Sequence, residues 1–403
     1  MTQRDSPRAL VRDALLLVAA LALSGQWIVL HGFAHLHLGP VAETILPGLA
    51  IFGAAVLLSW GAELAQLEIS QALAIAFLAL VAVLPEYAVD MYLAWKAAKD
   101  PLYTAFAAAN MTGANRLLIG LGWPVVLLAY WAMTRKRAIR VEPEQRLELV
   151  TLFVATCYAF VLPWKRSLSI VDTIVFIGLF VVYIRAASRG HIKEPGLAGP
   201  PERLAYLPRV WRRLATVGLF LLPAYTIFIS AEPFANGLLH NARRLGIEEF
   251  ILIQWLAPLA SEAPEFIVAV IFALRNNPTA GLGTLVSSKV NQWTLLVGML
   301  PLVYSISGGH LQSMMLDGRQ VEELFLTAAQ SLLALVVLSN LSFGLFEALL
   351  LLGLFLLQFM FPTPAVRTLL ATGYVVIAAG YLLNRSSRRS LADLFRYGWR
   401  AHG

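Results

Sequence analysis

The sequence predicts an all-α, polytopic membrane protein. Of its 403 residues 59% are hydrophobic and only 14% are charged, whereas soluble domains carry about a quarter charged residues. Apolar stretches close to the ~20 residues that cross a bilayer recur along the whole chain. The net charge of +7 does not indicate nucleic-acid binding, because the basic residues gather in the loops between apolar stretches. Such clustering is typical of membrane topology.

The apolar stretches predict about 12 transmembrane helices. They divide the chain into 1–42 (an N-terminal arm and an extra helix), 43–187 (a first five-helix repeat), 188–213 (a cytoplasmic linker), 214–360 (a second repeat) and 361–403 (an extra helix and a basic C-terminal tail). The helices are expected near 14–30, 43–65, 70–97, 102–132, 147–163, 169–187, 214–239, 248–274, 279–305, 322–340, 341–360 and 365–383.

Charge placement predicts the orientation. In this topology most lysines and arginines fall on the side of the N-terminus, which places both termini in the cytoplasm. Because five is an odd number, the second repeat would enter the membrane upside down, and inverted repeats are typical of transporters. A cleavage site at Ala20–Ala22 is an alternative for the first helix, but the apolar run continues beyond it and favours a retained helix.

A Pro-Glu pair stands early in one helix of each repeat, as Pro85-Glu86 and Pro264-Glu265. Charged groups at membrane depth are costly and usually mark a pathway or a binding site. Proline inside a helix removes one hydrogen bond from the carbonyl four residues earlier, here that of Val81 or Ala260. A carboxylate beside a free carbonyl suits a hard cation such as Ca2+.

Further oxygen ligands lie close to both pairs in the sequence. Glu86 and Asp90 are four residues apart and Glu262 and Glu265 three apart, so each pair can share one helix face. The following helix supplies amides and hydroxyls in both repeats. Kinking and helix–helix hydrogen bonding would explain one copy, but two copies at matching places favour an ion site. The predicted ligands are Glu86, Asp90, Asn110, Asn115, Ser261, Glu262, Glu265, Ser288 and Gln292.

Two motifs carry a resemblance to a known family. Leu84-Pro85-Glu86 and Ala263-Pro264-Glu265 match one motif, and Gly283 to Gln292 and Asn110 to Asn115 are similar to the amide-bearing motif one helix later. At these residues the chain resembles the sodium/calcium exchanger family of cation/calcium antiporters. The resemblance implies ten core helices in two inverted repeats. It also implies Glu86 and Glu265 as central carboxylates, and Asn115 and Gln292 as their amide partners.

The chain departs from the family pattern at two basic residues. Lys289 stands where the family usually has asparagine, and Arg116 follows Asn115. Because a lysine in a site of low dielectric constant can give up its proton, Lys289 is a candidate proton carrier or a tethered stand-in for a cation. A fixed salt bridge to Glu262 or Glu265 is the alternative. Arg116 is a second candidate internal cation.

The sequence therefore predicts a secondary active antiporter that exchanges Ca2+ for Na+ or H+ by alternating access at a midplane carboxylate site. Alternatives are a proton-coupled exchanger of another cation and a relative that no longer transports. Expected partners are inorganic cations and the lipid bilayer, without nucleic acid, and the sequence names no protein partner. No cofactor beyond the transported ions and no enzyme activity are expected. The bacterial inner membrane is the expected location.

Overall fold

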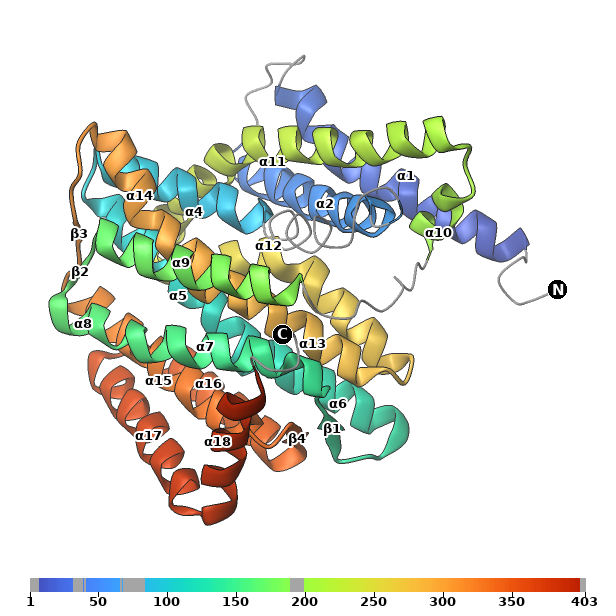
Figure 1. The fold of residues 1–403 in the computed structure, drawn as a ribbon. Coiled ribbons are helices and arrows are strands. Elements are labelled where there is room, and N and C mark those ends of the chain that lie inside the picture. Colours follow the sequence, from blue (N-terminus) through green and yellow to red (C-terminus); the bar gives the residue numbers. More distant parts are fainter. Residues whose placement is uncertain are drawn as a thin grey trace. The chain divides into compact units, whose positions relative to one another are not determined.

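A computed structural model describes residues 7–31, 41–65, 84–188 and 199–398, together with Gly39 and Leu67. The described chain is helical apart from four short strands (Figure 1). It forms two compact units, described in turn. The first contains Met1–Tyr92, His191–Leu252 and Ala260–Pro264, and the second contains Leu93–Gly190, Ile253–Leu259 and Glu265–Gly403.

The first unit is built around α2, which packs against both α1 and α11. Glycines in α2 permit this packing, since a Cβ on Gly61 would lie 3.0 Å from Leu219 of α11. In a membrane, such small residues let helix backbones approach closely. The hydroxyl of Ser24 also donates a 3.0 Å hydrogen bond to that of Thr226. The helices are α1 (Pro7–Val29), α2 (Ala42–Ala65), the first part of α4 (Leu84–Ala97), α10 (Pro200–Ala205) and α11 (Arg209–Leu245).

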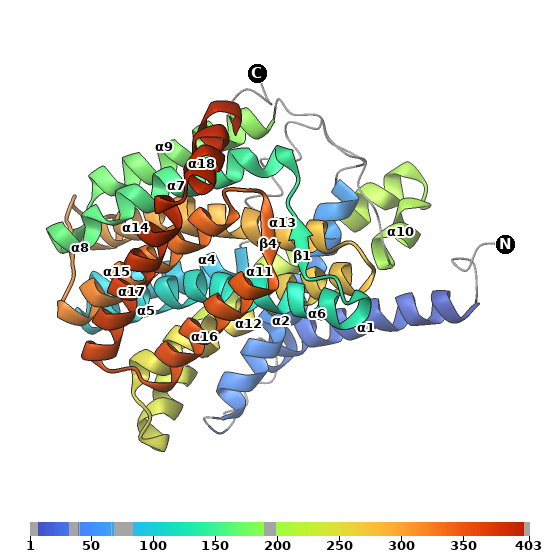
Figure 2. The same cartoon turned by 90° about the horizontal axis from the view of Figure 1, so that it is seen from below.

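The second unit is centred on α15, which packs against α5, α7 and α17 and is largely buried (Figure 2). Its elements are α5 (Leu102–Leu117), η3 (Leu118–Gly122), α6 (Trp123–Thr134), η4 (Pro143–Gln145), α7 (Arg146–Ala159), α8 (Val161–Lys165), α9 (Ile170–Ala187), most of α12 (Glu249–Leu274), α13 (Pro278–Asn291), η5 (Gln292–Leu296), α14 (Val297–Gly308), α15 (Gly318–Leu338), α16 (Leu345–Met360), α17 (Pro364–Leu383) and α18 (Arg385–Gly398). Strand β1 (Ala138–Arg140) pairs with β4 (Ser342–Gly344), and β2 (Ser167–Leu168) pairs with β3 (Met314–Met315), both antiparallel.

The same helix interruption occurs twice in the second unit. The runs α5–η3–α6 and α13–η5–α14 each consist of an α-helix, five residues of π-helix and a second α-helix. In the π-helical turns the N–H of Trp123 donates to the carbonyl of Leu118, and that of Val297 to Gln292, five residues back. Such turns widen a helix and are frequent at functional sites.

The predicted all-α membrane architecture is confirmed. Among the described residues nine helices are long and apolar enough to cross a membrane, with α16 shorter. The expected total of 12 is not established, and the segment near 70–97 lies partly outside the described residues. The helix expected at 341–360 begins instead at Leu345, because Leu341 has a positive φ of 57° and the next residues pair as β4 with β1. The expected basic tail contains a helix, α18.

Substitution of Gly113 tests the packing of α5 on α12. A Cβ at this position would overlap the carbonyl oxygen of Gln254, so Gly113→Ala must push the two backbones apart. We expect a loss of about 1–3 kcal/mol, as for other overpacked positions, seen as a lower midpoint of thermal unfolding in detergent. Gly178→Ala on α9, where the added Cβ meets no atom within 4 Å, is the matched control. Equal stability of both variants would contradict the described packing.

Candidate cation site

Four of the predicted ligands lie in the first unit. Glu86 and Asp90 occupy α4 one turn apart, and Ser261 and Glu262 are neighbours on α12. All four side chains are buried, Asp90 completely. Buried carboxylates are rarely found in proteins unless they are paired or coordinate a metal, so their placement suits a cation site. The carbonyl of Val81, which Pro85 was expected to free, lies outside the described residues.

Glu265 lies in the second unit, on the part of α12 that follows Pro264. The helix continues through Pro264, which has no N–H to donate to the carbonyl of Ala260. The Oε2 atom of Glu265 is buried and has no hydrogen-bond partner among the described residues. A buried carboxylate oxygen without a donor is costly unless it binds a proton or a cation. Glu265 is therefore suited to take either. The buried Oε2 of Glu148 on α7 also has no hydrogen-bond partner among the described residues, but of the two only Glu265 lies in a Pro-Glu motif.

Lys289 and Asn115 are in direct contact in the second unit. The ammonium of Lys289 donates to Oδ1 of Asn115 at 2.7 Å and to its backbone carbonyl at 3.1 Å. The amide nitrogen of Asn115 donates to the carbonyl of Met111 at 2.8 Å, which leaves Oδ1 facing the lysine. Lys289 is only 1% exposed and its ammonium lies 4.5 Å from the ring centre of Trp293. The lysine therefore takes an oxygen that was expected to serve the cation.

These two residues occupy equivalent positions in their helices. Asn115 stands three residues before the π-helical turn η3, and Lys289 stands three residues before η5. By this register the residue of the second repeat that corresponds to Asn115 is Lys289. The family resemblance had instead named Gln292 with Asn115, three residues later. The salt bridge from Lys289 to Glu265 is not formed in the described structure.

The remaining predicted ligands are also buried in the second unit. Asn110 lies on α5, Ser288 lies on α13, and Gln292 opens the π-helical turn η5. Amide and hydroxyl side chains inside membrane helices bind a substrate or hold helices together. Their placement on the two interrupted helix runs keeps them close in sequence to the Asn115–Lys289 contact.

Arg116 is held by a carboxylate that the sequence analysis did not select. Its guanidinium lies 2.5 Å from Glu323 of α15, and both side chains are buried. It also donates to Gln358 of α16 at 3.3 Å and stacks 5.0 Å from the ring centre of Trp255 of α12. The charge of Arg116 is thus compensated by Glu323, and it is not a mobile cation in this arrangement.

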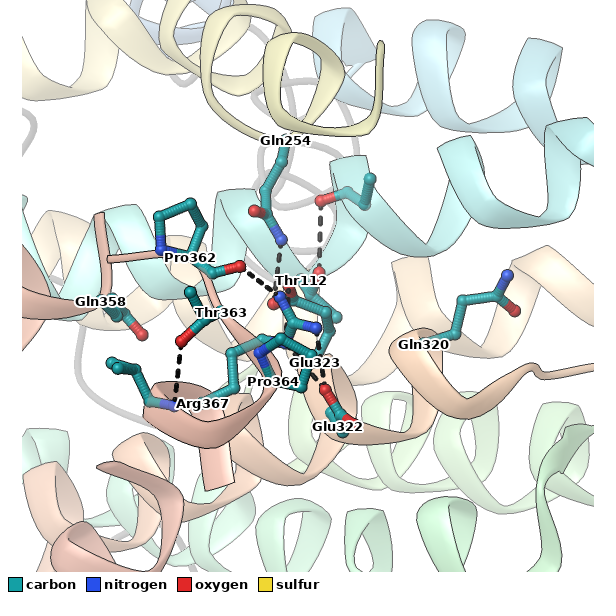
Figure 3. Close-up of polar contacts among 12 residues, drawn as sticks. Thr112, Gln254, Gln320, Glu322, Glu323, Gln358, Pro362, Thr363, Pro364 and Arg367 are labelled. Atoms are coloured by element: carbon teal, nitrogen blue, oxygen red, sulfur yellow. Dashed lines mark hydrogen bonds and ion pairs between the residues drawn. The ribbon is translucent and has the colours of Figure 1, made fainter. Parts of the chain in front are cut away.

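The Arg116–Glu323 pair belongs to a larger network in the second unit (Figure 3). Gln254 donates to Glu323 at 3.0 Å, and Arg367 of α17 reaches Glu323 at 3.8 Å and Glu322 at 2.8 Å. With Arg319 of α15, three arginines lie close to the two glutamates, and the network ties α5, α12, α15 and α17 together. The sequence signals were Glu322-Glu323 inside the apolar segment of α15 and Arg367 near the start of the helix expected at 365–383.

A comparison of the sequence with models of protein families found a match in two parts of the chain. The model of the family described as sodium/calcium exchanger protein matches residues 44–188 and again 215–363. The chain belongs to the sodium/calcium exchanger family. The two matches are the two repeats of that family, and they cover both Pro-Glu motifs and both π-helical turns. The protein is accordingly an integral membrane protein, as its apolar helices indicate.

Solved structures of other proteins share the fold. The H+/Ca2+ exchanger CAX is 42% identical to this chain, with a TM-score of 0.93 over 97% of this chain and 98% of that one. YfkE has a TM-score of 0.59 at 16% identity, over 90% of this chain and 99% of its own. The sodium-calcium exchanger NCX_Mj has a TM-score of 0.53 at 18% identity, over 80% and 98%. A comparison with curated protein sequences found no match.

The charge network yields a prediction about stability. Glu323→Gln leaves Arg116 buried without its counter-charge, and breaking a buried pair in this way costs about 3–5 kcal/mol. We expect that loss in the free energy of unfolding, measured by SDS titration in mixed micelles. Glu322→Gln is the matched control on the same helix, because Glu322 is 31% exposed and should lose much less. If both variants unfold alike, Arg116 is not dependent on Glu323.

Proposed function

We propose that this protein is a Ca2+ antiporter that uses H+ as its counter-ion. The observation that carries the proposal is the buried carboxylate of Glu265, whose Oε2 has no hydrogen-bond partner among the described residues. It lies in a Pro-Glu motif of an exchanger family. A carboxylate at membrane depth can be neutralised by a divalent cation or by protons, and only one of these at a time. Competition for the same oxygens is the physical basis of exchange.

The choice of H+ over Na+ rests on Lys289. Sodium, like other hard cations, needs oxygen ligands, and the ammonium of Lys289 already takes both oxygens of Asn115. A fixed ammonium also repels a second cation placed beside it. A proton needs only a carboxylate oxygen, so the lysine does not obstruct it. The 42% identity to an H+/Ca2+ exchanger supports the same choice.

In this proposal the carboxylates carry the ions and the basic residues do not. In each Pro-Glu motif the glutamate, Glu86 or Glu265, binds Ca2+ when ionised and releases it when protonated, and Asp90 and Glu262 are proposed as further acidic ligands. Lys289 stays charged and bound to Asn115, and Arg116 stays paired with Glu323. The cation site opens alternately to each side of the membrane, so that Ca2+ and protons cross in opposite directions.

Uptake of 45Ca2+ into proteoliposomes tests the proposal. We expect uptake when the vesicle interior is acidic relative to the bath, and none above background under an outward Na+ gradient at equal pH. Collapse of the pH gradient by a protonophore should abolish the signal. Uptake driven by Na+ alone would overturn the choice of counter-ion, and no uptake under either gradient would overturn Ca2+ as the substrate.

Substitution of Glu265 should stop transport. Glu265→Gln keeps the shape of the side chain but can neither ionise nor exchange a proton, so we expect H+-driven 45Ca2+ uptake to fall to the level of protein-free liposomes. Glu347→Gln on α16 is the matched control, because Glu347 is also a carboxylate in an apolar helix but lies outside the repeat motifs. Transport by Glu265→Gln at the wild-type rate would remove the central claim.

Substitution of Lys289 tests the counter-ion choice by design. Lys289→Asn removes the ammonium, frees Oδ1 of Asn115 and adds a second amide oxygen, so we expect Ca2+ uptake to become responsive to a Na+ gradient. Lys289→Met also removes the ammonium but adds no oxygen, and it should gain less Na+ response. Measurement of uptake against Na+ and pH in both variants checks this. Wild-type ion dependence in both would show that the lysine does not select the counter-ion.

A further inference from the structure

Helix α18 begins where the chain leaves the membrane. Helix α17 is apolar and long enough to span the bilayer, and it ends at Leu383. Asn384 has extended backbone angles (φ −72°, ψ 127°), so the helix axis breaks there, and α18 starts at Arg385. A helix that starts at the end of a span has its first turn at the membrane surface, and its 14 residues extend about 21 Å. α18 therefore either leaves the surface or lies along it.

One face of α18 is fixed against α7 (Figure 2). Leu394 and Gly398 are the buried residues of α18, and a Cβ on Gly398 would lie 2.8 Å from the side chain of Val150. The rings of Phe395 and Phe153 also meet edge to face at 5.3 Å. This packing holds α18 in one rotational setting about its axis.

The contacts on α7 lie along its side. Arg146 stacks 5.8 Å from the ring centre of Tyr397, and together with Val150 and Phe153 it follows the i, i+4, i+7 spacing of a single helix face. Arg146 is the first residue of α7. Helix α18 thus packs against the flank of the first two turns of a membrane span, at interfacial depth.

The face of α18 opposite Leu394 and Gly398 is a stripe of arginines. At 100° per residue, Arg385, Arg388, Arg389 and Arg396 fall within about a third of the helix circumference, with Ala392 between them. All four are exposed, and none forms an ion pair with a carboxylate in the described part of the chain. Asp393 is the one acidic residue of the helix. The rotational setting fixed by α7 therefore presents a concentrated positive charge away from the protein.

We propose that α18 is an interfacial helix whose arginine stripe (Arg385, Arg388, Arg389 and Arg396) binds the headgroups of anionic phospholipids. Basic helices that directly follow a membrane span recognise anionic lipid through charge, and amphipathic helices with an arginine-rich polar face lie in the interface plane. The position of α18 beside α7 favours a lipid surface over a nucleic acid or an acidic protein, because the bilayer is already adjacent. The proposal is independent of the transported ion.

A fluorescent probe in the stripe tests it. Ala392→Cys in a Cys157→Ser background places one acrylodan label between the arginines of the full-length protein. The labelled protein is reconstituted into phosphatidylcholine liposomes with 0 to 30 mol % phosphatidylglycerol. We expect phosphatidylglycerol to shift the emission to the blue and to reduce quenching by iodide. Salt at 0.5 M should reverse both effects, because the attraction is screened.

Two triple variants of the stripe distinguish the effect of its charge from a change in the folding of α18. Arg388→Gln, Arg389→Gln and Arg396→Gln together should abolish most of the shift between 0 and 30 mol % phosphatidylglycerol, since each basic residue near an anionic surface contributes about a fivefold change in affinity. The same three positions changed to lysine keep the charge and should behave like the wild type. An equal response to neutral and anionic lipid, or an unchanged response in the glutamine variant, would overturn the proposal. A blue shift that needs added nucleic acid or acidic protein would overturn the choice of partner.

Discussion

The hydrocarbon interior of a membrane offers no hydrogen-bond partner to a charged group, and this constraint organises the polar residues of the chain. Arg116 meets it through Glu323, Gln358 and Trp255. Lys289 meets it through the two oxygens of Asn115 and the face of Trp293. The Oε2 atom of Glu265 has no hydrogen-bond partner within the described structure. A bound cation or a proton can compensate this carboxylate instead.

The π-helical turns explain how two similar helix runs bring these groups together. A turn with one extra residue rotates the side chains that follow it relative to those before it. Asn115 and Lys289 lie at the same distance before such turns, so the two repeats place equivalent side chains face to face. Where one position is asparagine and the other lysine, an acceptor faces a donor and the pair closes on itself. Two asparagines in the same geometry would leave both carbonyl oxygens available to a cation.

The fold class and the two repeats could be predicted because they depend on hydrophobic length and on motifs that are local in sequence. The Pro-Glu pairs were visible for the same reason. The register of Asn115 against Lys289 could not be predicted, since a π-helical turn has no sequence signature and shifts the alignment by a few residues. The partner of Arg116 could not be predicted either. Glu323 lies far from Arg116 in the sequence, and a charged residue in an apolar helix does not show which neighbouring helix its side chain faces. The helical nature of the basic tail was missed because it depends on packing against α7.

The buried arginine–glutamate network and the buried Glu265 of the second unit differ in a way that fits different roles. The network of Arg116, Arg367, Glu322 and Glu323, with Arg319 close by, pairs both carboxylates with arginines and joins four helices. Carboxylates that are paired with arginines do not need a bound cation, and removal of one member leaves a neighbour uncompensated, so the network favours a rigid framework. Glu265 has no arginine partner among the described residues, and its carboxylate sits one residue after a proline, which cannot donate to the helix carbonyl four residues earlier. A transporter needs both a rigid framework and a carboxylate without a fixed partner. An ion can bind and leave only where the protein's own groups do not already occupy the ligand oxygens. Such a site keeps its geometry only when the surrounding helices are held in place.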